Sequence, residues 1–357
     1  MVFVGVDVHM SYLEIAEIGA DGKLESRRRI GNTPESIDAF VKSLDSDAKV
    51  AMESCSYFYP LYNRLEEAGI EAKVAHPLKV KLIAESRIKN DKIDAMVLAQ
   101  LYRMNYLPTS YVPPKEVRQV RALLRHRTAL VRQRTQVKNR IHHLLEKNGV
   151  KTKGLGCSDI FGKGGLTRIH RVDLPTIERS ILNTDLGLLE YFTKTIDQLG
   201  SGLARIASEN LQARLLMTIP GIDYYAALLL LMEIGDINRF SDPKKLCCYS
   251  GLVPGLYQSG QVARYGHITK QGNKWIRYIL VEAVGHTIRH DPDSEIHRMY
   301  MRIKARKGHS VAKVACARKL LKVMWFMLTR NEPYRYSDSQ LIKRKERRLE
   351  RKASKCY

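Results

Sequence analysis

The segment VFVGVDV, residues 2–8, places a carboxylate, Asp7, in the middle of a valine-rich run. A run this rich in β-branched residues is typical of a central strand that is buried within a sheet. A carboxylate in such a strand is costly to bury unless a partner offsets its charge. This segment therefore constrains the fold strongly, because it requires both a sheet around the strand and a group that neutralises Asp7.

The pattern in residues 1–110 predicts a mixed α/β domain. The segments YLEIAEIG and KLESRRRIG flank a turn at Asp21-Gly22, so we expect the first three strands to form a meander. Thr33-Pro34 predicts the cap and first turn of a helix. Two further strands, KVAMES and IEAKVAHP, alternate with the helical segments PLYNRLEEAG and DKIDAMVLAQLYRM. By analogy with known folds, this order of elements is that of the RNase H-like nucleases.

Four carboxylates converge in that fold. Glu53 ends the fourth strand, and Asp91 and Asp94 lie three residues apart on one helix, so they share a face. With Asp7 they form a set that needs divalent cations, and oxygen ligands favour Mg²⁺ or Mn²⁺. Two such ions, about 4 Å apart, position a phosphodiester for in-line attack. Taken alone, the two helical aspartates would be a solvated helix face, and Glu53 an exposed strand end.

The charge of the chain is unevenly distributed. The net charge is +23, and residues 1–110 contribute −2 of it, which leaves +25 for residues 111–357. An excess this large and this local indicates a polyanionic partner, with nucleic acid favoured over a role in solubility alone. An anionic membrane surface is a weaker alternative, because no amphipathic stretch with exposed Trp or Phe accompanies the charge.

The rear of the chain predicts mainly helical structure. Residues 115–148 form one long basic helix with an imperfect heptad seam, suited to a helical hairpin or a coiled coil that pairs subunits. Residues 151–170 predict a turn region, 174–210 further helix, and Gly251–Gly272 a glycine-rich loop. We therefore divide the chain into residues 1–110, a basic helical region at 111–205, a helical C-terminal domain at 206–335, and a basic tail at 336–357.

Several classes of protein are disfavoured. The longest apolar run, Ala226–Met232, is far shorter than a membrane span, and the N-terminus shows no signal peptide. The six cysteines include no C-x-x-C and no zinc spacing, so a reducing cytoplasm is expected and a structural zinc is not.

Two sets of motifs resemble a known family. The first is GVDVH, AMES and KNDKIDA, and the second is IPGIDYYAALLLLMEIGD followed by GLVPGLYQSGQVARYGHITKQGNKWIRYIL. Together they resemble the DEDD transposases of the insertion-sequence 110 family, from Val4 to about Tyr334. The resemblance implies a RuvC-like catalytic domain with Asp7, Glu53, Asp91 and Asp94 as metal ligands, and a C-terminal transposase domain that completes the site with a serine.

The resemblance also implies the role of that serine, which is to attack DNA and form a covalent phosphoserine while a 3′-hydroxyl is freed. The family carries two serines before a glycine, whereas this chain reads Tyr257-Gln258-Ser259-Gly260, so only Ser259 matches. Serine is a weak nucleophile at neutral pH, and Mg²⁺ held by the carboxylates is the natural activator. Tyr257 is a rival nucleophile, and Ser250 a weaker one.

Basic residues are expected to hold phosphates. Those around the serine are Arg264, His267, Lys270, Lys274 and Arg277, and those on the long helix are Arg125, Arg132 and Lys138. The turn at residues 219–222 resembles a helix-hairpin-helix, whose backbone N–H groups can bind a phosphate. Asp223 would repel phosphate, however, and an ordinary turn between two helices fits the sequence equally well.

The resemblance implies donor and target DNA as partners, a structured guide (bridge) RNA that pairs with both, and a homodimer that assembles to a tetramer. Inversion of DNA, rather than transposition, is an alternative within the same family. Outside this reaction, the rivals are a junction-resolving nuclease in which the same carboxylates activate water, and a non-enzymatic nucleic-acid binder.

Overall fold

The computed structural model describes residues 1–84, 91–151, 156–157, 159–259 and 262–355, and describes Lys92, Ser259 and Ala263 by their backbone alone. The chain divides into two compact units, Met1–Pro113 and Pro114–Tyr357, which are considered separately below. The division falls at Pro113-Pro114, immediately before the long basic helix. No helix in the described ranges combines the length and the apolar character that a membrane crossing requires.

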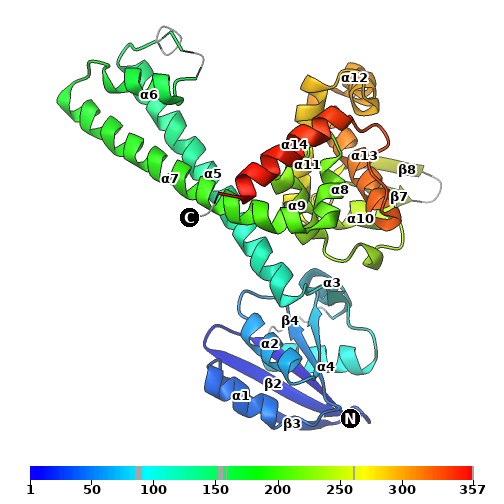
Figure 1. The fold of residues 1–357 in the computed structure, drawn as a ribbon. Coiled ribbons are helices and arrows are strands. Elements are labelled where there is room, and N and C mark those ends of the chain that lie inside the picture. The colour runs from blue at the N-terminus through cyan, green and yellow to red at the C-terminus, as the bar shows by residue number, and fades with distance from the viewer. Residues whose placement is uncertain (85–90, 152–155, 158, 260–261, 356–357) are drawn as a thin grey trace. The chain divides into compact units, whose positions relative to one another are not determined.

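Unit 1 is built on one mixed sheet of six strands in the order β3-β2-β1-β4-β5-β6 (Figure 1). The strands are β1 (Val2–Val8), β2 (Tyr12–Gly19), β3 (Leu24–Gly31), β4 (Lys49–Glu53), β5 (Glu71–Ala75) and β6 (Thr109–Ser110). The first three strands are antiparallel, whereas β1, β4 and β5 run parallel to one another. The predicted meander and the RNase H-like order of elements are both confirmed.

Helices cover both faces of this sheet. They are α1 (Pro34–Lys42), α2 (Tyr59–Glu67), α3 (Pro77–Ile83) and α4 (Asp91–Arg103). Side chains of α1 and α2 pack on alternate valines of β1, and Thr33 caps α1 as predicted. On the other face, Leu98 and Tyr102 of α4 pack on Phe3. Because side chains alternate along a strand, α4 lies on the face to which Phe3, Gly5 and Asp7 belong.

Gly5 lets α4 approach the sheet closely. A Cβ atom built on Gly5 would lie 1.8 Å from the carbonyl oxygen of Ala95 and 2.7 Å from the amide nitrogen of Ala99. No side chain fits in that space, so the helix backbone rests directly on the strand. The glycine thus sets the distance at which the first turn of α4 faces the end of β1.

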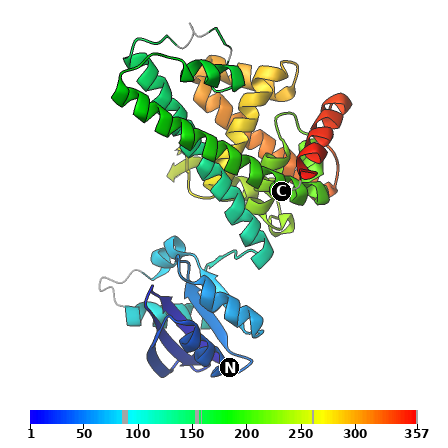
Figure 2. The same ribbon diagram turned by 60° about the vertical axis from the view of Figure 1, so that its left-hand side comes forward.

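Unit 2 begins with two long helices, α5 (Lys115–Lys147) and α7 (Thr176–Glu209), joined through α6 (Lys163–His170). Both views show α5 and α7 side by side (Figures 1 and 2). At the end near α6, Ile141 and Leu145 of α5 pack with Leu182 of α7 in a buried cluster. The long basic helix and the returning helix are therefore confirmed, and within one chain they form the helical hairpin.

The rest of unit 2 is a helical domain around a central buried helix. Its elements are α8 (Leu211–Met217), α9 (Tyr224–Ile234), the short 3₁₀ helix η2 (Ile237–Arg239), α10 (Pro243–Tyr249), β7 (Pro254–Ser259), β8 (Val262–Ile268), α11 (Lys274–His290), α12 (Glu295–Lys307), α13 (His309–Arg330) and α14 (Ser339–Ala353). Nearly every residue of α9 is buried, which explains why its sequence shows no polar face.

Two expectations for this unit were wrong. The glycine-rich segment Gly251–Gly272 is not simply a loop, because β7 and β8 form an antiparallel hairpin within it. The basic tail at 336–357 was expected to be solvated or to lie on nucleic acid, but its helix α14 packs along α7. Its Leu349 is buried, and the Nζ atom of Lys345 donates hydrogen bonds to the carbonyl oxygens of Met217, Ile219 and Ile222 at 2.7, 2.6 and 2.8 Å. The many charged residues of α14 concealed, at the level of sequence, the apolar positions through which this helix packs.

The turn at residues 219–222 is an ordinary turn between α8 and α9. Ile219 and Ile222 are buried, and three carbonyl groups at the turn and the end of α8 accept from Lys345. Asp223 caps α9 by accepting from the backbone N–H of Ala226 at 2.9 Å. This capping role explains the aspartate at a position where a phosphate-binding hairpin carries glycine.

Candidate metal centre and the C-terminal hairpin

The fold brings the first strand and the first turn of α4 together at one end of the sheet. Asp7 is buried, and it lies on the α4 face of β1. Asp91 is the first residue of α4, and Asp94 follows one turn later on the same side. The close approach at Gly5 holds this turn against the strand end. Strand alternation and helix packing therefore bring Asp7 and Asp91 together, with Asp94 on the same side of α4.

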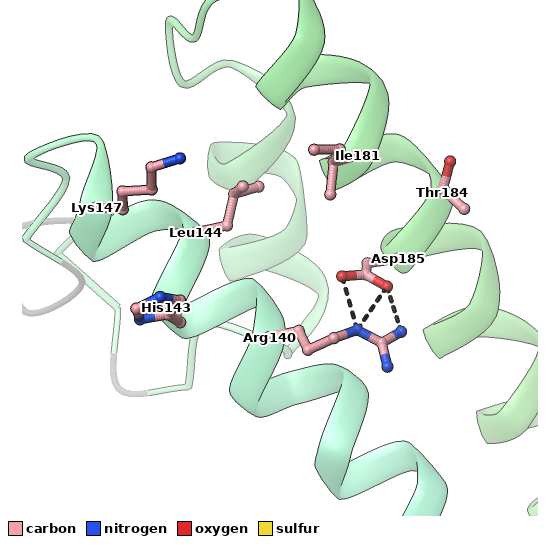
Figure 3. A pocket seen from close by; sticks show the side chains of 7 residues that line it. All are labelled: Arg140, His143, Leu144, Lys147, Ile181, Thr184 and Asp185. Atoms are coloured by element: carbon pink, nitrogen blue, oxygen red, sulfur yellow. Dashed lines mark hydrogen bonds and ion pairs between the residues drawn. The ribbon is translucent and has the colours of Figure 1, made fainter.

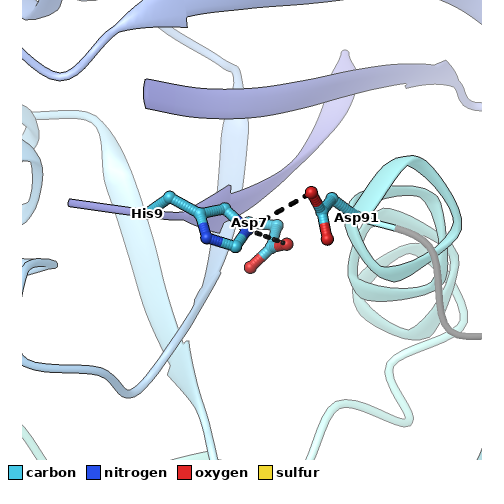
Figure 4. Close-up of side chains that lie close together, drawn as sticks. All are labelled: Asp7, His9 and Asp91. Carbon is cyan, nitrogen blue, oxygen red and sulfur yellow. Dashed lines mark hydrogen bonds and ion pairs between the residues drawn. The ribbon is translucent and has the colours of Figure 1, made fainter. Parts of the chain in front are cut away.

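Three side chains form a tight cluster at this point, Asp7, His9 and Asp91, whose candidate ligand atoms all lie within 4.8 Å of one another. Figure 4 shows the imidazole of His9 beside Asp7, with Asp91 reaching toward both from α4. His9 Nε2 lies 3.0 Å from Asp7 Oδ2 and 3.5 Å from Asp91 Oδ2. The cluster combines two carboxylates with one nitrogen donor.

The electrostatics of the cluster reflect its burial. Removal of Asp7 from water is the largest effect on its carboxyl group and raises its pKa, and the charges of Asp91 and Asp94 raise it further. His9 acts in the opposite direction on Asp7. A hydrogen bond donated by the Tyr12 hydroxyl, 2.9 Å from Asp91 Oδ2, is the main cause that lowers the pKa of Asp91. A bound cation would offset the repulsion among these carboxylates.

The two other predicted ligands lie nearby but outside this tight cluster, as far as the described residues show. Glu53 ends β4, and the parallel register of β1 and β4, with Val6 opposite Met52, places Asp7 and Glu53 at adjacent strand ends. The charge of Asp94 reaches the Asp7 carboxyl group, as its effect on the pKa shows. The role of Glu53 and Asp94 as metal ligands stays a prediction.

The sequence analysis missed His9 and Tyr12. The signal for His9 was present in GVDVH, because a residue two positions after Asp7 on a strand returns to the same face. Tyr12 gave no such signal, since it lies on β2 and reaches Asp91 from a strand that is distant in sequence.

The donor set fits a divalent cation. The carboxylate oxygens of the two aspartates in the cluster suit Mg²⁺ or Mn²⁺. Burial raises the pKa of Asp7, and the contact with His9 offsets part of this rise, so a cation at this point would stabilise the carboxylate further. The residues that would hold the ion are Asp7 and Asp91, with Glu53 and Asp94 as further predicted ligands.

The predicted nucleophile lies in unit 2, on the β7–β8 hairpin. Ser259 is the last residue of β7 and its backbone is paired with Val262, but its side chain lies outside the described part of the chain. Tyr257, two residues before Ser259, is paired across the hairpin with Arg264, and both side chains are exposed. Gly260 and Gln261, the next two residues, are also outside the described ranges.

Ser250, the weaker rival, is unsuited to attack DNA. It is fully buried, and its hydroxyl donates to the carbonyl oxygen of Cys247 at 2.8 Å. Tyr257 is 77% exposed, so its accessibility leaves it as a rival to Ser259.

Four of the five basic residues predicted near the serine are exposed. Arg264 and His267 lie on β8, Lys270 lies in the following turn, and Lys274 begins α11. Arg277 instead supports the hairpin, because its guanidinium donates to the carbonyl oxygens of Ser250 at 2.8 Å and Gly272 at 3.1 Å. Contact of these residues with phosphate stays a prediction.

The basic residues predicted on α5 all have partners within unit 2. Arg125 forms a bidentate ion pair with the fully buried Glu233, at 2.7 and 2.8 Å. The guanidinium of Arg132 lies over the rings of Trp275 and Tyr278, and Lys138 lies over Phe161. Each contact gives the residue a structural role, and binding of nucleic acid by the same residues stays a prediction.

A pocket of about 430 Å³ lies between α5 and α7 near α6. Figure 3 shows its lining, in which Asp185 is held by the guanidinium of Arg140. The walls are formed by the paired helices, and the lining includes Leu144, Ile181 and Thr184. Its only acidic lining residue is already paired, so the pocket has no free carboxylate to offer a metal ion.

Comparison with known proteins finds two matching family models. One, described as a transposase, matches residues 4–148, and the other, described as the transposase IS116/IS110/IS902 family, matches residues 213–300. The first match spans the sheet and its acidic cluster, and the second spans the β7–β8 hairpin.

Whole-chain relatives agree with these matches. The transposase for insertion sequence element IS1111A of Coxiella burnetii is 30% identical over 93% of this chain and 91% of the relative. The transposase for insertion sequence element IS1328 of Yersinia enterocolitica is 28% identical over 78% of this chain and 83% of the relative. A solved structure of T. thermophilus RuvC with a Holliday junction substrate aligns with 31% of this chain at 15% identity, with a TM-score of 0.24. The strand order, rather than this alignment, identifies the fold of unit 1.

Proposed function

Because the chain belongs to the IS110 family of transposases, we propose that it cleaves and rejoins DNA strands through a phosphoserine formed by Ser259. The acidic cluster of unit 1 is the observation that carries this proposal. A divalent cation bound there, Mg²⁺ or Mn²⁺, would supply charge neutralisation and orientation for the scissile phosphate. The protein is then an enzyme of an insertion sequence, acting on DNA in the cytoplasm.

In the proposed reaction, the hydroxyl oxygen of Ser259 attacks the phosphorus of a DNA phosphodiester. A bond forms between serine Oγ and phosphorus, the bond from phosphorus to the 3′ oxygen breaks, and the serine proton passes to the departing 3′ oxygen. In the second step a 3′-hydroxyl from another strand attacks the phosphoserine and frees the serine. One phosphodiester is exchanged for another, so no water and no external energy source are consumed.

The side chains of the acidic cluster have separate roles in this proposal. Asp7 and Asp91 would hold the cation, with Glu53 and Asp94 as further predicted ligands. Tyr12 fixes the Asp91 carboxylate through its hydroxyl. On the hairpin, the exposed Arg264 and Lys270 bind phosphates on either side of the attacked bond.

The proposed partners are donor and target DNA together with a guide RNA that pairs with both. The net charge of +25 on residues 111–357 supports a large polyanion, because neutralising many phosphates releases counterions. A protein guided in this way needs to recognise the shape and backbone of its duplexes rather than their bases. Strand exchange between two DNAs needs several subunits, so we propose a homodimer that assembles to a tetramer.

One experiment tests the proposal directly. Purified protein is incubated with Mg²⁺, labelled DNA from the end of the insertion sequence and RNA transcribed from its flank, and the products are separated under denaturing conditions. We expect a protein–DNA adduct that Ser259→Ala abolishes and Tyr257→Phe retains. An adduct that survives Ser259→Ala would assign the nucleophile elsewhere.

The second candidate is a hydrolytic junction nuclease that uses the same acidic cluster. It predicts DNA cleavage without any adduct, together with full activity in Ser259→Ala. A DNA invertase would form the same adduct, and differs in that both recombining sites lie on one DNA molecule.

A further inference from the structure

The imidazole of His9 contacts both aspartates of the acidic cluster, which come from different elements. Its Nε2 atom is 3.0 Å from Asp7 Oδ2 and 3.5 Å from Asp91 Oδ2, and Figure 4 shows the ring directed toward both carboxylates. These contacts make His9 the third donor of the cluster.

The position of the imidazole is fixed by the turn between β1 and β2. The backbone N–H of His9 donates to the carbonyl oxygen of Tyr12 at 2.9 Å, and Asn32 Nδ2 donates to the carbonyl oxygen of His9 at 2.7 Å. The ring stacks on Tyr12 with 4.5 Å between centroids, and the guanidinium of Arg29 lies 4.2 Å above the Tyr12 ring. A ring held on its backbone and on its face is already oriented for binding.

Tyr12 therefore supports two members of the cluster at once. Its ring stacks on the imidazole of His9, and its hydroxyl donates to Asp91 Oδ2 at 2.9 Å. Such outer partners orient the ligands of metal sites and affect metal affinity strongly. Asp91 and His9 are therefore both positioned by Tyr12, as metal ligands are positioned by their outer partners, and together with Asp7 they are not three independent surface side chains.

The distances within the cluster suit ligands of one ion. Donor atoms that are about 2.1 Å from a cation lie about 3.0 Å apart at octahedral angles and about 3.4 Å apart at tetrahedral angles. The separations of His9 Nε2 from the two carboxylate oxygens, 3.0 and 3.5 Å, are close to these values. The same separations also fit hydrogen bonds from the imidazole to the carboxylates, which is the competing interpretation.

We propose that His9 Nε2 is a direct ligand of the divalent cation, with Tyr12 as a positioning residue, and that the site consequently prefers Mn²⁺ to Mg²⁺. Imidazole nitrogen binds Mn²⁺ and the later transition metals better than Mg²⁺, which prefers oxygen ligands and retained water. This inference rests on the proposed function, because it concerns the same metal centre.

The decisive measurement is pulsed EPR of Mn²⁺ bound to the full-length protein. We expect a ¹⁴N coupling that becomes a ¹⁵N coupling in protein labelled with ¹⁵N-histidine, and that disappears in His9→Gln. His126→Gln, which alters an exposed histidine of α5, is the matched control and should keep the coupling. Titration should show Mn²⁺ affinity weakened by about tenfold or more in His9→Gln, with a smaller change for Mg²⁺.

Tyr12→Phe separates positioning from ligation. It keeps the aromatic stack under His9 and removes the hydroxyl that holds Asp91. We expect the ¹⁴N coupling to remain while Mn²⁺ affinity falls several-fold. If the affinity of Tyr12→Phe equals that of the wild type, the positioning role is wrong.

The outcomes distinguish this inference from the proposed function. Mn²⁺ that binds the wild type and is lost in Asp7→Asn, but shows no ¹⁴N coupling, overturns ligation by His9 and leaves the metal centre in place. Absence of Mn²⁺ binding to the wild type overturns the metal centre itself, and with it both proposals.

Discussion

The strand that carries Asp7 and the strand that carries Ser259 lie in opposite environments. β1 is a central strand with hydrogen-bonded neighbours on both edges, and all but one of its seven residues are buried. β7 belongs to a two-stranded hairpin whose described side chains, among them Tyr257 and Tyr265, are largely exposed. An isolated hairpin of this kind is only marginally stable, whereas a central strand is rigid.

The difference between the two strands matches the roles proposed for Asp7 and Ser259. The proposed metal ligands would need fixed separations, and they lie on a central strand and on the first turn of a helix packed on it. The proposed nucleophile would need to reach DNA and later release it, and it lies on an exposed hairpin. The charge distribution follows the same division, with −2 on residues 1–110 and +25 on the remainder. The predictions below test whether chemistry and binding separate in this way.

The largest effect is expected at Asp7. In Asp7→Asn, adduct formation should fall by about a thousandfold or more, because the cation loses its most buried ligand. In the absence of metal, the free energy of unfolding of this variant should equal or exceed that of the wild type. Burial raises the pKa of Asp7, so its carboxylate weakens folding as the pH rises through that range, and the neutral amide removes this effect. DNA affinity in a mobility-shift assay should stay within about twofold, and a large loss of binding would contradict the separation.

The second effect concerns the close packing at Gly5. Gly5→Ala places a Cβ against the Ala95 carbonyl and should destabilise unit 1 by about 3 kcal/mol. Hydrogen exchange measured peptide by peptide should rise in residues 1–113 and stay unchanged in α5 and α7. The control is Gly187→Ala on α7, where a Cβ meets nothing within 4 Å and a stabilisation of about 0.5–1 kcal/mol is expected.

The third effect tests the anchoring of α14. Lys345→Met leaves three carbonyl groups without their donor and should destabilise unit 2 by about 2 kcal/mol. Burial lowers the pKa of Lys345 from 10.5 to about 8. Between these values the unfolded chain binds more protons than the folded one, so the stability of the wild type should rise with pH relative to the variant. Thermal melts from pH 7 to 10 measure this, and a difference that does not change with pH would rule out the buried lysine as its source.

The smallest effect is expected from the exposed lysines near the hairpin. Replacing Lys270 and Lys274 by glutamine should weaken DNA binding several-fold and lower the slope of log affinity against log salt by about two, one for each phosphate contact. The matched control replaces Lys23 and Lys42, two exposed lysines of unit 1, and should leave the slope unchanged. If both pairs of substitutions lowered the salt slope equally, DNA binding would depend on the net charge of the whole chain and not on the lysines near the hairpin.

The sequence predicted most of the fold because its local signals agree with the final structure. Thr33 caps α1, the alternate valines of β1 pack on α1 and α2, and the long basic helix begins and ends where expected. The prediction was wrong where local composition opposed tertiary packing. The five glycines of residues 251–272 and the polar residues among them concealed the pairing of β7 with β8, and the dense charge of α14 concealed Leu349 and the buried Lys345.

The sequence by itself determined the first five strands of the sheet and the two aspartates of the acidic cluster, because strand and helix periodicity fix which side chains share a face. Only the tertiary structure decided that His9 contacts both Asp7 and Asp91 and that Tyr12 contacts both His9 and Asp91. The tertiary structure also decided that Arg125 forms an ion pair with the buried Glu233. These contacts join elements that are distant along the chain, and their geometry depends on how closely those elements pack, which no local pattern encodes.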